Sequence, residues 1–488
     1  MLRRSALWVC LGATLLAACA PQTGAVKRTV DPRKNIEVAV STSDSTLVAS
    51  DIISIESTSS NAYTRADKPG TMDVRLRIKT KSMPGAPRPP INVAVVVDTS
   101  ASMEGTAMDD AKKACTALLD KLSPGDRLSL IAFHSGVDVL VPSTVLTTKS
   151  MDEIRQKITA MKPFGTTNLA AGLTAGLAEA RKNFRADGIN RIVLLGDGVP
   201  NDPTSLPALA QSSGQSKIAI TTLGLGLDYD ETVMSTIALN SGGKYHFIKE
   251  SAKVAEVFQD EVLRLQRVVA RGVALRLATG PGVSIQNVVG LPMNGASSVL
   301  LGDMIEGEER DVVVRLSVPA KHDGSVVELM DAEVDFDHPT RAGQRLAERT
   351  FAAVKSTSSV EQIAESRNRD VERSAARTNL ADKIVRAVAA ARSGQLPLAM
   401  SLLDTAEKEA KVWAKDLEDP ILAEKLESLG PLRRSLPSLV QRDVPAPVVQ
   451  VPNAPGLPMP GRAPVAAPSP AAIVMDAQAD AMQALQGH

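Results

Sequence analysis

The sequence predicts an α/β protein with a doubly wound, mostly parallel sheet, followed by a β-sandwich and a C-terminal helical segment. Between residues 90 and 270, apolar strands alternate with amphipathic helices, which is typical of a parallel sheet covered on both faces. Residues 271–355 change to strand-like patterns broken by Gly, Pro and Asn. Residues 359–440 are rich in Ala, Leu, Glu and Arg at helical spacing.

Length and composition exclude some classes of function. The 488 residues are enough for about two to four domains. Aromatic residues are only 2% of the chain, which argues against stacking on sugars or single-stranded nucleic acid. Lys and Arg number 55, as do Asp and Glu, so there is no basic excess for DNA. We therefore expect no nucleic-acid partner.

Residues 1–19 indicate a lipoprotein signal peptide. Arg3 and Arg4 precede an apolar stretch at 6–16 that is too short for a comfortable transmembrane helix. The stretch ends in the sequence LAAC, which resembles the lipobox of bacterial lipoproteins and places Cys19 at the cleavage site. This resemblance implies that Cys19 carries lipid. The alternative is an ordinary signal peptide followed by a chance cysteine.

The lipobox also implies a location. Several acyl chains on Cys19 would anchor the mature protein in a membrane of the cell envelope. Ala20, rather than an acidic residue, follows Cys19, and by family analogy this favours the outer membrane of a Gram-negative bacterium. With Cys10 removed and Cys19 lipidated, only Cys115 remains, so no intramolecular disulfide is expected. The apolar neighbours of Cys115 at helical spacing indicate a buried core thiol.

Residues 20–71 are predicted to be a Ser/Thr-rich linker. Eleven of the twenty residues between 41 and 60 are Ser or Thr, a composition that favours a flexible spacer. Residues 72–89 combine an alternating strand with the proline-rich connection MPGAPRPP, and this strand can belong to the later β domain.

The 90–270 region supplies the elements of the predicted parallel sheet. We expect buried strands at 91–97, 127–133, 189–196 and 217–227. We expect amphipathic helices at Met108–Leu122, Met151–Met161, Asn168–Asn183 and Ala252–Val269.

The C-terminal third changes character twice. Residues 359–440 contain a helical hairpin with its turn at Ser393-Gly394, which resembles a tetratricopeptide pair but is too short for an array. Residues 441–488 are Pro- and Ala-rich and are predicted to be a disordered tail. The last residues could instead form a small amphipathic helix.

Polar side chains gather where three elements of the α/β region begin or end. Asp98, Ser100 and Ser102 follow the first buried strand, Thr167 stands before a helix, and Asp197 follows the strand IVLL. Ligands bind at the carboxyl ends of parallel strands, so we expect these side chains to lie together. Two carboxylates and three hydroxyls suit a hard cation, Mg²⁺ above all, with Mn²⁺ or Ca²⁺ as alternatives. The few charges leave room for a carboxylate from a partner.

The pattern DxSxS, then Thr, then Asp in a DG turn resembles the metal-ion-dependent adhesion site of von Willebrand factor type A (VWA) domains, and the resemblance covers residues 90–270. It implies that Ser100 and Ser102 bind the metal directly, and that Thr167 does so in a ligand-competent state. Asp98 and Asp197 would act mainly through waters. The structural alternative is that these side chains only cap helices and turns.

Two positions depart from the family pattern without removing a ligand. Ala101 stands where many bacterial relatives have Gly, and Gly196 stands where a Thr commonly precedes the Asp. The missing Thr could loosen the support around the metal. The broader layout resembles bacterial VWA lipoproteins and, more distantly, inter-alpha-trypsin inhibitor heavy chains, in which a β domain adjoins the VWA domain.

Enzymatic functions are not favoured. Ser100 replaces the second acid of the Asp-x-Asp pattern in haloacid-dehalogenase phosphatases, and the chain has neither a P-loop nor a GxSxG motif. His134 and His246 lie in apolar strand contexts typical of structural histidines. We therefore expect no enzyme but a membrane-anchored, adhesion-like protein that binds an acidic group on a protein partner. The alternative is a structural or assembly scaffold of the cell envelope with incidental metal binding.

Overall fold

The computed structural model describes residues 26–29, 37–40, 48–85, 87–197, 199–227, 229–440 and 468–486. By its internal contacts the chain divides into two units, Met1–Thr46 and Leu47–His488. In the first unit, β1 (Val26–Thr29) and β2 (Glu37–Val40) form an antiparallel pair. The signal peptide and Cys19 lie outside the described residues. Within the described ranges, no helix combines the length and apolarity needed to cross a bilayer.

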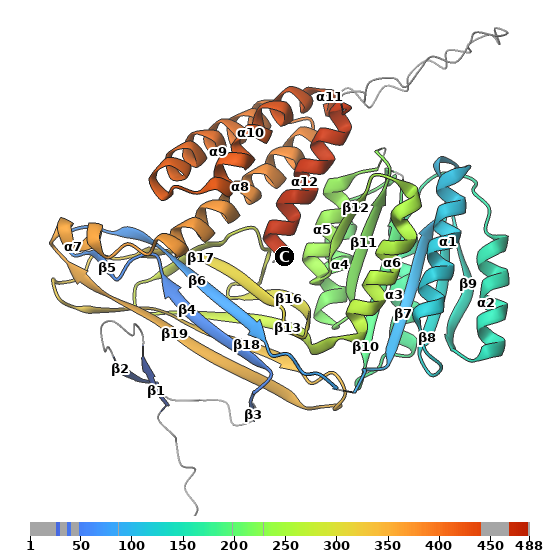
Figure 1. The fold of residues 1–488 in the computed structure, drawn as a ribbon, viewed down its shortest axis with the longest axis horizontal. Coiled ribbons are helices and arrows are strands. Elements are labelled where there is room, and N and C mark those ends of the chain that lie inside the picture. Colours follow the sequence, from blue (N-terminus) through green and yellow to red (C-terminus); the bar gives the residue numbers. More distant parts are fainter. Residues whose placement is uncertain are drawn as a thin grey trace, which may run out of the picture. The chain divides into compact units, whose positions relative to one another are not determined.

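Six strands form the sheet of the α/β domain, in the order β12-β11-β10-β7-β8-β9 (Figure 1). All neighbours are parallel except β9, which runs antiparallel to β8 at one edge. This confirms the predicted α/β fold class. The strands are β7 (Ile91–Asp98), β8 (Arg127–Phe133), β9 (Val137–Val145), β10 (Ile189–Gly196), β11 (Ala219–Leu225) and β12 (Tyr245–Ile248).

Helices cover both faces of this sheet (Figure 1). They are α1 (Thr106–Lys121), α2 (Thr148–Ala160), α3 (Leu169–Lys182), α4 (Leu206–Gln215), α5 (Glu231–Ser241) and α6 (Val254–Gln266), with 3₁₀ turns η1 (Ala101–Met103) and η2 (Ser251–Lys253). The residue pattern did not predict α4. In α4, Pro207 and Gly214 obscure the helical pattern, and Gly214 packs directly on the backbone of Ser241. In α5, both polar and apolar residues are buried, so no amphipathic stripe is present.

Two further sheets pack around one apolar core and form the β domain. The first sheet has the order β15-β16-β13-β18-β19-β3, with β5 also paired to β19, and the second has the order β14-β17-β6-β4. The strands are β3 (Val48–Ala49), β4 (Ile53–Ser59), β5 (Tyr63–Arg65), β6 (Gly70–Thr80), β13 (Val268–Thr279), β14 (Ser284–Val288), β15 (Met293–Asn294), β16 (Ser298–Ile305), β17 (Glu309–Val318), β18 (Val326–Asp337) and β19 (Arg345–Thr357).

The prediction of a flexible linker over 20–71 is wrong for residues 53–59. These residues form β4, which pairs antiparallel with β6. Ile53 and Ile55 are buried, while Ser54 between them and Glu56 after them are exposed. This alternation is the strand signal, and the high Ser/Thr content hid it. As the sequence suggested for residues 72–80, β6 belongs to the β domain.

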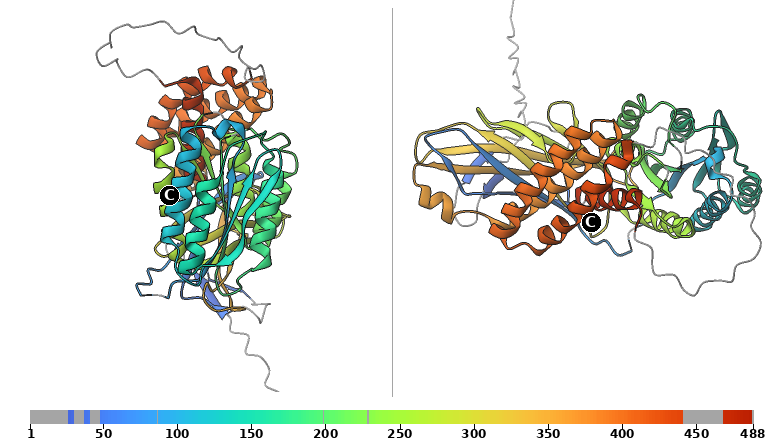
Figure 2. Two further views of the ribbon diagram at one scale, coloured as in Figure 1. Left: turned by 90° about the vertical axis from the view of Figure 1, so that its right-hand side faces the viewer. Right: turned by 90° about the horizontal axis from the view of Figure 1, so that it is seen from above.

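Of the remaining helices, α8 to α12 lie over the junction between the β domain and the α/β domain when seen from above (Figure 2), whereas α7 contacts β5 and β19 in the β domain. In α8 and α9 the expected hairpin is present, with Gly394 at φ 74° in its turn. The helices are α7 (Val360–Glu365), α8 (Arg369–Arg392), α9 (Leu396–Leu417), α10 (Pro420–Ser435), α11 (Pro437–Val440) and α12 (Pro470–Gln486).

The prediction of a disordered tail over 441–488 is wrong for residues 470–486, which form α12, as the alternative of a C-terminal helix suggested. Met475 and Met482 of this helix are fully buried. Gln486 accepts a hydrogen bond from the Tyr245 backbone N–H (3.5 Å) and donates one to the Gly243 carbonyl (3.3 Å) at the edge of β12. The low charge and high Ala content of the segment hid its packing role. Residues 441–467 lie outside the described part of the chain.

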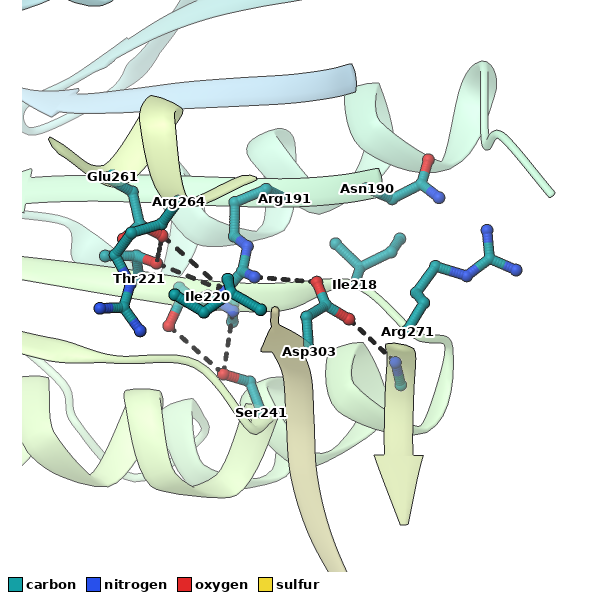
Figure 3. Close-up of polar contacts among 12 residues, drawn as sticks. Asn190, Arg191, Ile218, Ile220, Thr221, Ser241, Glu261, Arg264, Arg271 and Asp303 are labelled. Atoms are coloured by element: carbon teal, nitrogen blue, oxygen red, sulfur yellow. Dashed lines mark hydrogen bonds and ion pairs between the residues drawn. The ribbon is translucent and has the colours of Figure 1, made fainter. Parts of the chain in front are cut away.

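A buried ionic network joins the β domain to the α/β domain (Figure 3). Arg191 of β10 donates from Nη2 to Oδ2 of Asp303 on β16 at 2.8 Å, and both side chains are buried. Oδ1 of Asp303 accepts the backbone N–H of Gly272 at 2.9 Å. On the other side, Nη1 of Arg191 donates to the Thr221 hydroxyl at 3.4 Å, and this hydroxyl donates to Oε1 of Glu261. The central sheet is therefore fixed to its neighbour by paired charges rather than by apolar contact alone.

Lys244 is a further buried cation at this junction. It lines a small cavity of about 40 Å³, and its Nζ lies 3.8 Å from Oε1 of Glu308. Burial lowers the pKa of Lys244 to about 7, although Glu308 opposes this shift. The folded state therefore loses the Lys244 proton at a pH where the unfolded chain still holds it.

The junction predicts a pH dependence of stability. Between about pH 7 and the unfolded lysine pKa of about 10.4, the unfolded chain binds one more proton at Lys244, so the free energy of unfolding should rise with pH. Lys244→Met should flatten this rise and stabilise the protein most below pH 7. Urea unfolding of wild type and variant across this range measures the difference. Lys149→Met, at an exposed position of α2, is the control, and parallel profiles for wild type and Lys244→Met would contradict the prediction.

Candidate metal-binding site

The loop after β7 is folded tightly against the neighbouring strand. Asp98 is the last residue of β7 and is fully buried. Its Oδ1 accepts the backbone N–H of Ser100 at 2.8 Å, which turns the chain toward η1. Thr99 donates to the carbonyl of Phe133 on β8 through its backbone N–H (2.7 Å) and its hydroxyl (3.1 Å). The DxSxS segment is therefore held at the end of the sheet.

A chain of hydrogen bonds joins this loop to the loop after β10. The hydroxyls of Ser100 and Ser102 lie 2.9 Å apart, and Ser102 donates to Oδ1 of Asp197 at 2.8 Å. Asp98 and Ser100 are buried, whereas Ser102 is exposed and Asp197 is half-buried. The oxygens of the two loops thus converge at a place that opens to solvent on one side.

The loop that carries Thr167 lies against the same place. The Gly165 carbonyl accepts the Ala101 backbone N–H at 3.0 Å, and the Phe164 backbone N–H donates to the Thr99 carbonyl at 2.8 Å. Gly165 has a φ of 76°, and a Cβ there would lie 2.7 Å from the Ser135 hydroxyl, so only glycine fits. Thr167 itself is buried. The structure therefore brings all five predicted ligand residues to the carboxyl edge of the sheet.

Helix α3 positions the Thr167 loop by lying directly on the sheet. Asn168 caps its N-terminus by accepting the Ala171 N–H at 3.2 Å. Gly172 and Gly176, one turn apart, face the strands: a Cβ would lie 2.6 Å from the Phe133 ring at the first position and 2.4 Å from Val96 at the second. The close approach of α3 therefore depends on these two glycines.

The two departures from the family pattern are accommodated. At Gly196, a Cβ would lie 3.5 Å from Oδ2 of Asp98, which is an ordinary contact, so this position faces the Asp98 carboxylate. At Ala101, the backbone N–H makes the contact to Gly165, and this contact does not use the side chain. Neither residue displaces a predicted ligand.

The donor set fits a hard cation. Most zinc sites consist of three or four His, Cys, Asp or Glu side chains. Among the described residues, no group of three or more such side chains is placed to hold a metal. The edge offers instead two carboxylates and three hydroxyls, oxygen ligands that suit Mg²⁺ or a similar ion with retained waters.

Three side chains of chemically reactive types, Cys115, His134 and His246, are buried or partly buried. Burial raises the pKa of the Cys115 thiol to about 12, so its thiolate is negligible at neutral pH. Burial also lowers the pKa of His246. His134 is buried, and its Nδ1 accepts the Gly136 backbone N–H at 2.9 Å.

Two residues that join distant segments, Asn201 near the site and Arg392 at the end of α8, were not singled out from the sequence. Asn201 donates its backbone N–H to the Thr167 carbonyl (3.1 Å) and its amide to the Thr166 hydroxyl (3.3 Å), which links two of the loops. Arg392, at the end of α8, donates from Nε to Oε1 of the fully buried Glu231 at 3.0 Å. Such contacts join segments far apart in the chain, so no local pattern could reveal them.

The packing of α3 yields a prediction. Gly172→Ala places a methyl group in the Phe133 ring, so it should lower the free energy of unfolding by about 1–3 kcal/mol and displace the Thr167 loop. Chemical denaturation measures the change in stability, and the backbone amide NMR signals of residues 164–169 report the displacement of the loop. Gly430→Ala in α10 is the control, because a Cβ there meets only the end of Arg434 at 3.6 Å. An unchanged Gly172→Ala protein would show that close packing of α3 does not set the loop position.

The α/β domain is similar to a known protein family. Residues 92–261 match the family model of the von Willebrand factor type A domain. The chain is 26% identical over 281 residues to the uncharacterized protein sll0103 of Synechocystis, covering 54% of this chain and 66% of that one. It is 23% identical over 281 residues to human inter-alpha-trypsin inhibitor heavy chain H4, covering 54% of this chain and 30% of that one. The chain thus spans less than two thirds of these relatives' length.

Two solved structures share the architecture. A von Willebrand factor type A protein from Catenulispora acidiphila superposes with a TM-score of 0.62 at 19% identity, covering 78% of this chain and 89% of that chain. The ArnB paralog VWA2 from Sulfolobus acidocaldarius gives a TM-score of 0.54 at 16% identity, covering 80% and 98%. At these identities the likeness concerns the fold.

Proposed function

We propose that this chain, which contains a von Willebrand factor type A domain, is a membrane-anchored binding protein that uses a Mg²⁺ ion to hold an acidic group of a protein partner. The observation that carries the proposal is the hydrogen-bonded set of oxygens from Ser100, Ser102 and Asp197 at the carboxyl edge of the sheet. Mn²⁺ or Ca²⁺ are the alternative ions.

The residues have distinct roles in this proposal. The hydroxyls of Ser100 and Ser102 bind the ion, and Thr167 joins them in the ligand-competent state. Asp98 and Asp197 supply negative charge and hold waters around it. These residues do not fill the coordination shell of a divalent ion. A carboxylate oxygen of the partner completes the shell.

Exposure favours binding of a macromolecule at this edge. Ser102 is exposed and Asp197 is half-buried, so a side chain on another protein can reach the ion without opening the fold. Binding rather than catalysis is our proposal, because the five predicted ligands are hydroxyls and carboxylates that the ion itself would engage.

A scaffold function has less support. It would need the helical region to offer its apolar faces to other proteins. Buried residues of α8, α9, α10 and α12 instead form one continuous core with the α3–α5 face of the α/β domain. In this proposal the helices therefore support the binding domain and do not themselves bind partners.

Metal binding is tested by titrating the purified chain with Mg²⁺. Wild type should gain thermal stability with added Mg²⁺, and Asp98→Ala should bind the ion about 10–100-fold more weakly, because a residue that orients the metal's ligands is lost. Ser100→Ala provides a second, smaller truncation in case Asp98→Ala unfolds. Asp152→Ala, on the exposed surface of α2, should behave as wild type. Equal Mg²⁺ affinity in all four proteins would refute the site.

The membrane anchor is proposed from the lipobox. Cys19→Ser should abolish palmitate labelling and release the protein from salt-washed membranes, because several acyl chains are needed for stable anchoring. Cys10→Ser should change neither property, because Cys10 leaves with the signal peptide. Retention of Cys19→Ser in the washed membrane fraction would show that another element holds the protein there.

A further inference from the structure

Two large apolar side chains are exposed on the loops that carry the candidate site. Phe164 is 52% exposed and lies three positions before Thr167, and Val199 is 56% exposed and lies two positions after Asp197. The whole chain has seven phenylalanines. Aromatic side chains are enriched in protein–protein interfaces relative to the rest of the surface.

Phe164 is held in place rather than free. Its ring packs on the His134 imidazole, with ring centroids 3.8 Å apart and an interplanar angle of 39°. Its backbone N–H donates to the Thr99 carbonyl at 2.8 Å. His134 beneath it is buried. A fixed aromatic side chain loses little conformational entropy when a partner covers it.

Val199 is tied to the same surface. Asn201, two residues further on, bonds to the Thr167 carbonyl and the Thr166 hydroxyl. These bonds fix the loop after β10 to the loop that carries Phe164. The two apolar side chains therefore lie on the loops that carry the predicted ligands Thr167 and Asp197, and these loops are hydrogen-bonded to each other.

We propose that Phe164 and Val199 form an apolar rim that selects partners in which the acidic residue stands next to a large apolar one. The inference rests on the proposed function. A metal-bound carboxylate contributes little discrimination, because every exposed Asp or Glu offers one. An adjacent Leu, Ile or Phe packs on the rim, buries apolar area and excludes water from the metal–carboxylate contact.

The test compares two short peptides with one aspartate, flanked either by leucines or by glycines, binding to the full chain in Mg²⁺. Wild type should bind the leucine peptide at least about tenfold more tightly, a difference of about 1.4 kcal/mol, and EDTA should abolish both interactions. Phe164→Ser and Val199→Ser should each reduce the affinity ratio of the two peptides toward one. A change in metal affinity alters the binding of both peptides by the same factor, so it cancels in the affinity ratio.

Two variants complete the design. Phe164→Leu keeps an apolar side chain and should retain most of the preference. Phe184→Ser removes a similarly exposed phenylalanine (39%) from the segment before β10, away from the site, and should keep the wild-type ratio. If the rim variants keep the wild-type ratio, or wild type shows no preference, the rim is refuted while metal-dependent binding stands. If wild type binds neither peptide in a Mg²⁺-dependent way, the proposed function itself fails.

Discussion

The parallel pairing of β7 with β8 and β10 is the constraint on which the candidate site depends. In register, Asp98 lies opposite Phe133 of β8, and Val97 lies opposite Leu195 of β10. The strands therefore end level, and their loops leave the sheet at the same edge. Continuous burial of β7 on both faces stabilises this arrangement through the hydrophobic effect, so the fold itself brings the oxygens together.

The rest of the chain supports this edge from a distance. Arg191 near the start of β10 is anchored to Asp303 of the β domain (Figure 3), while Asp197 directly follows the end of the same strand. Arg392 fixes the end of α8 to Glu231 at the start of α5. Removal of one member of such a buried pair leaves an uncompensated charge. The β domain and the helices therefore act together with the α/β domain as parts of one support.

Much of this could be predicted from the sequence where local patterns decide the structure. The strands β7, β8, β10 and β11 are largely continuous apolar runs. The loops that carry Asp98 and Asp197 follow from the ends of β7 and β10, and the loop that carries Thr167 precedes α3. Prediction failed where packing overrides composition. The isoleucines of β4 stand in a Ser/Thr-rich segment, and α12, which the sequence offered only as an alternative, follows a Pro- and Ala-rich stretch. The exposure of Phe164 depends on contacts with His134 and Thr99, which no spacing encodes.

The central claim is that five residues on three loops form one cation site. The most direct measurement is a crystal structure of the chain grown with Mn²⁺, with anomalous scattering used to locate the metal. The account predicts one anomalous peak at the carboxyl edge of the sheet, in contact with the hydroxyls of Ser100 and Ser102. A metal-loaded crystal with its peak elsewhere, or with none at this edge, would contradict it.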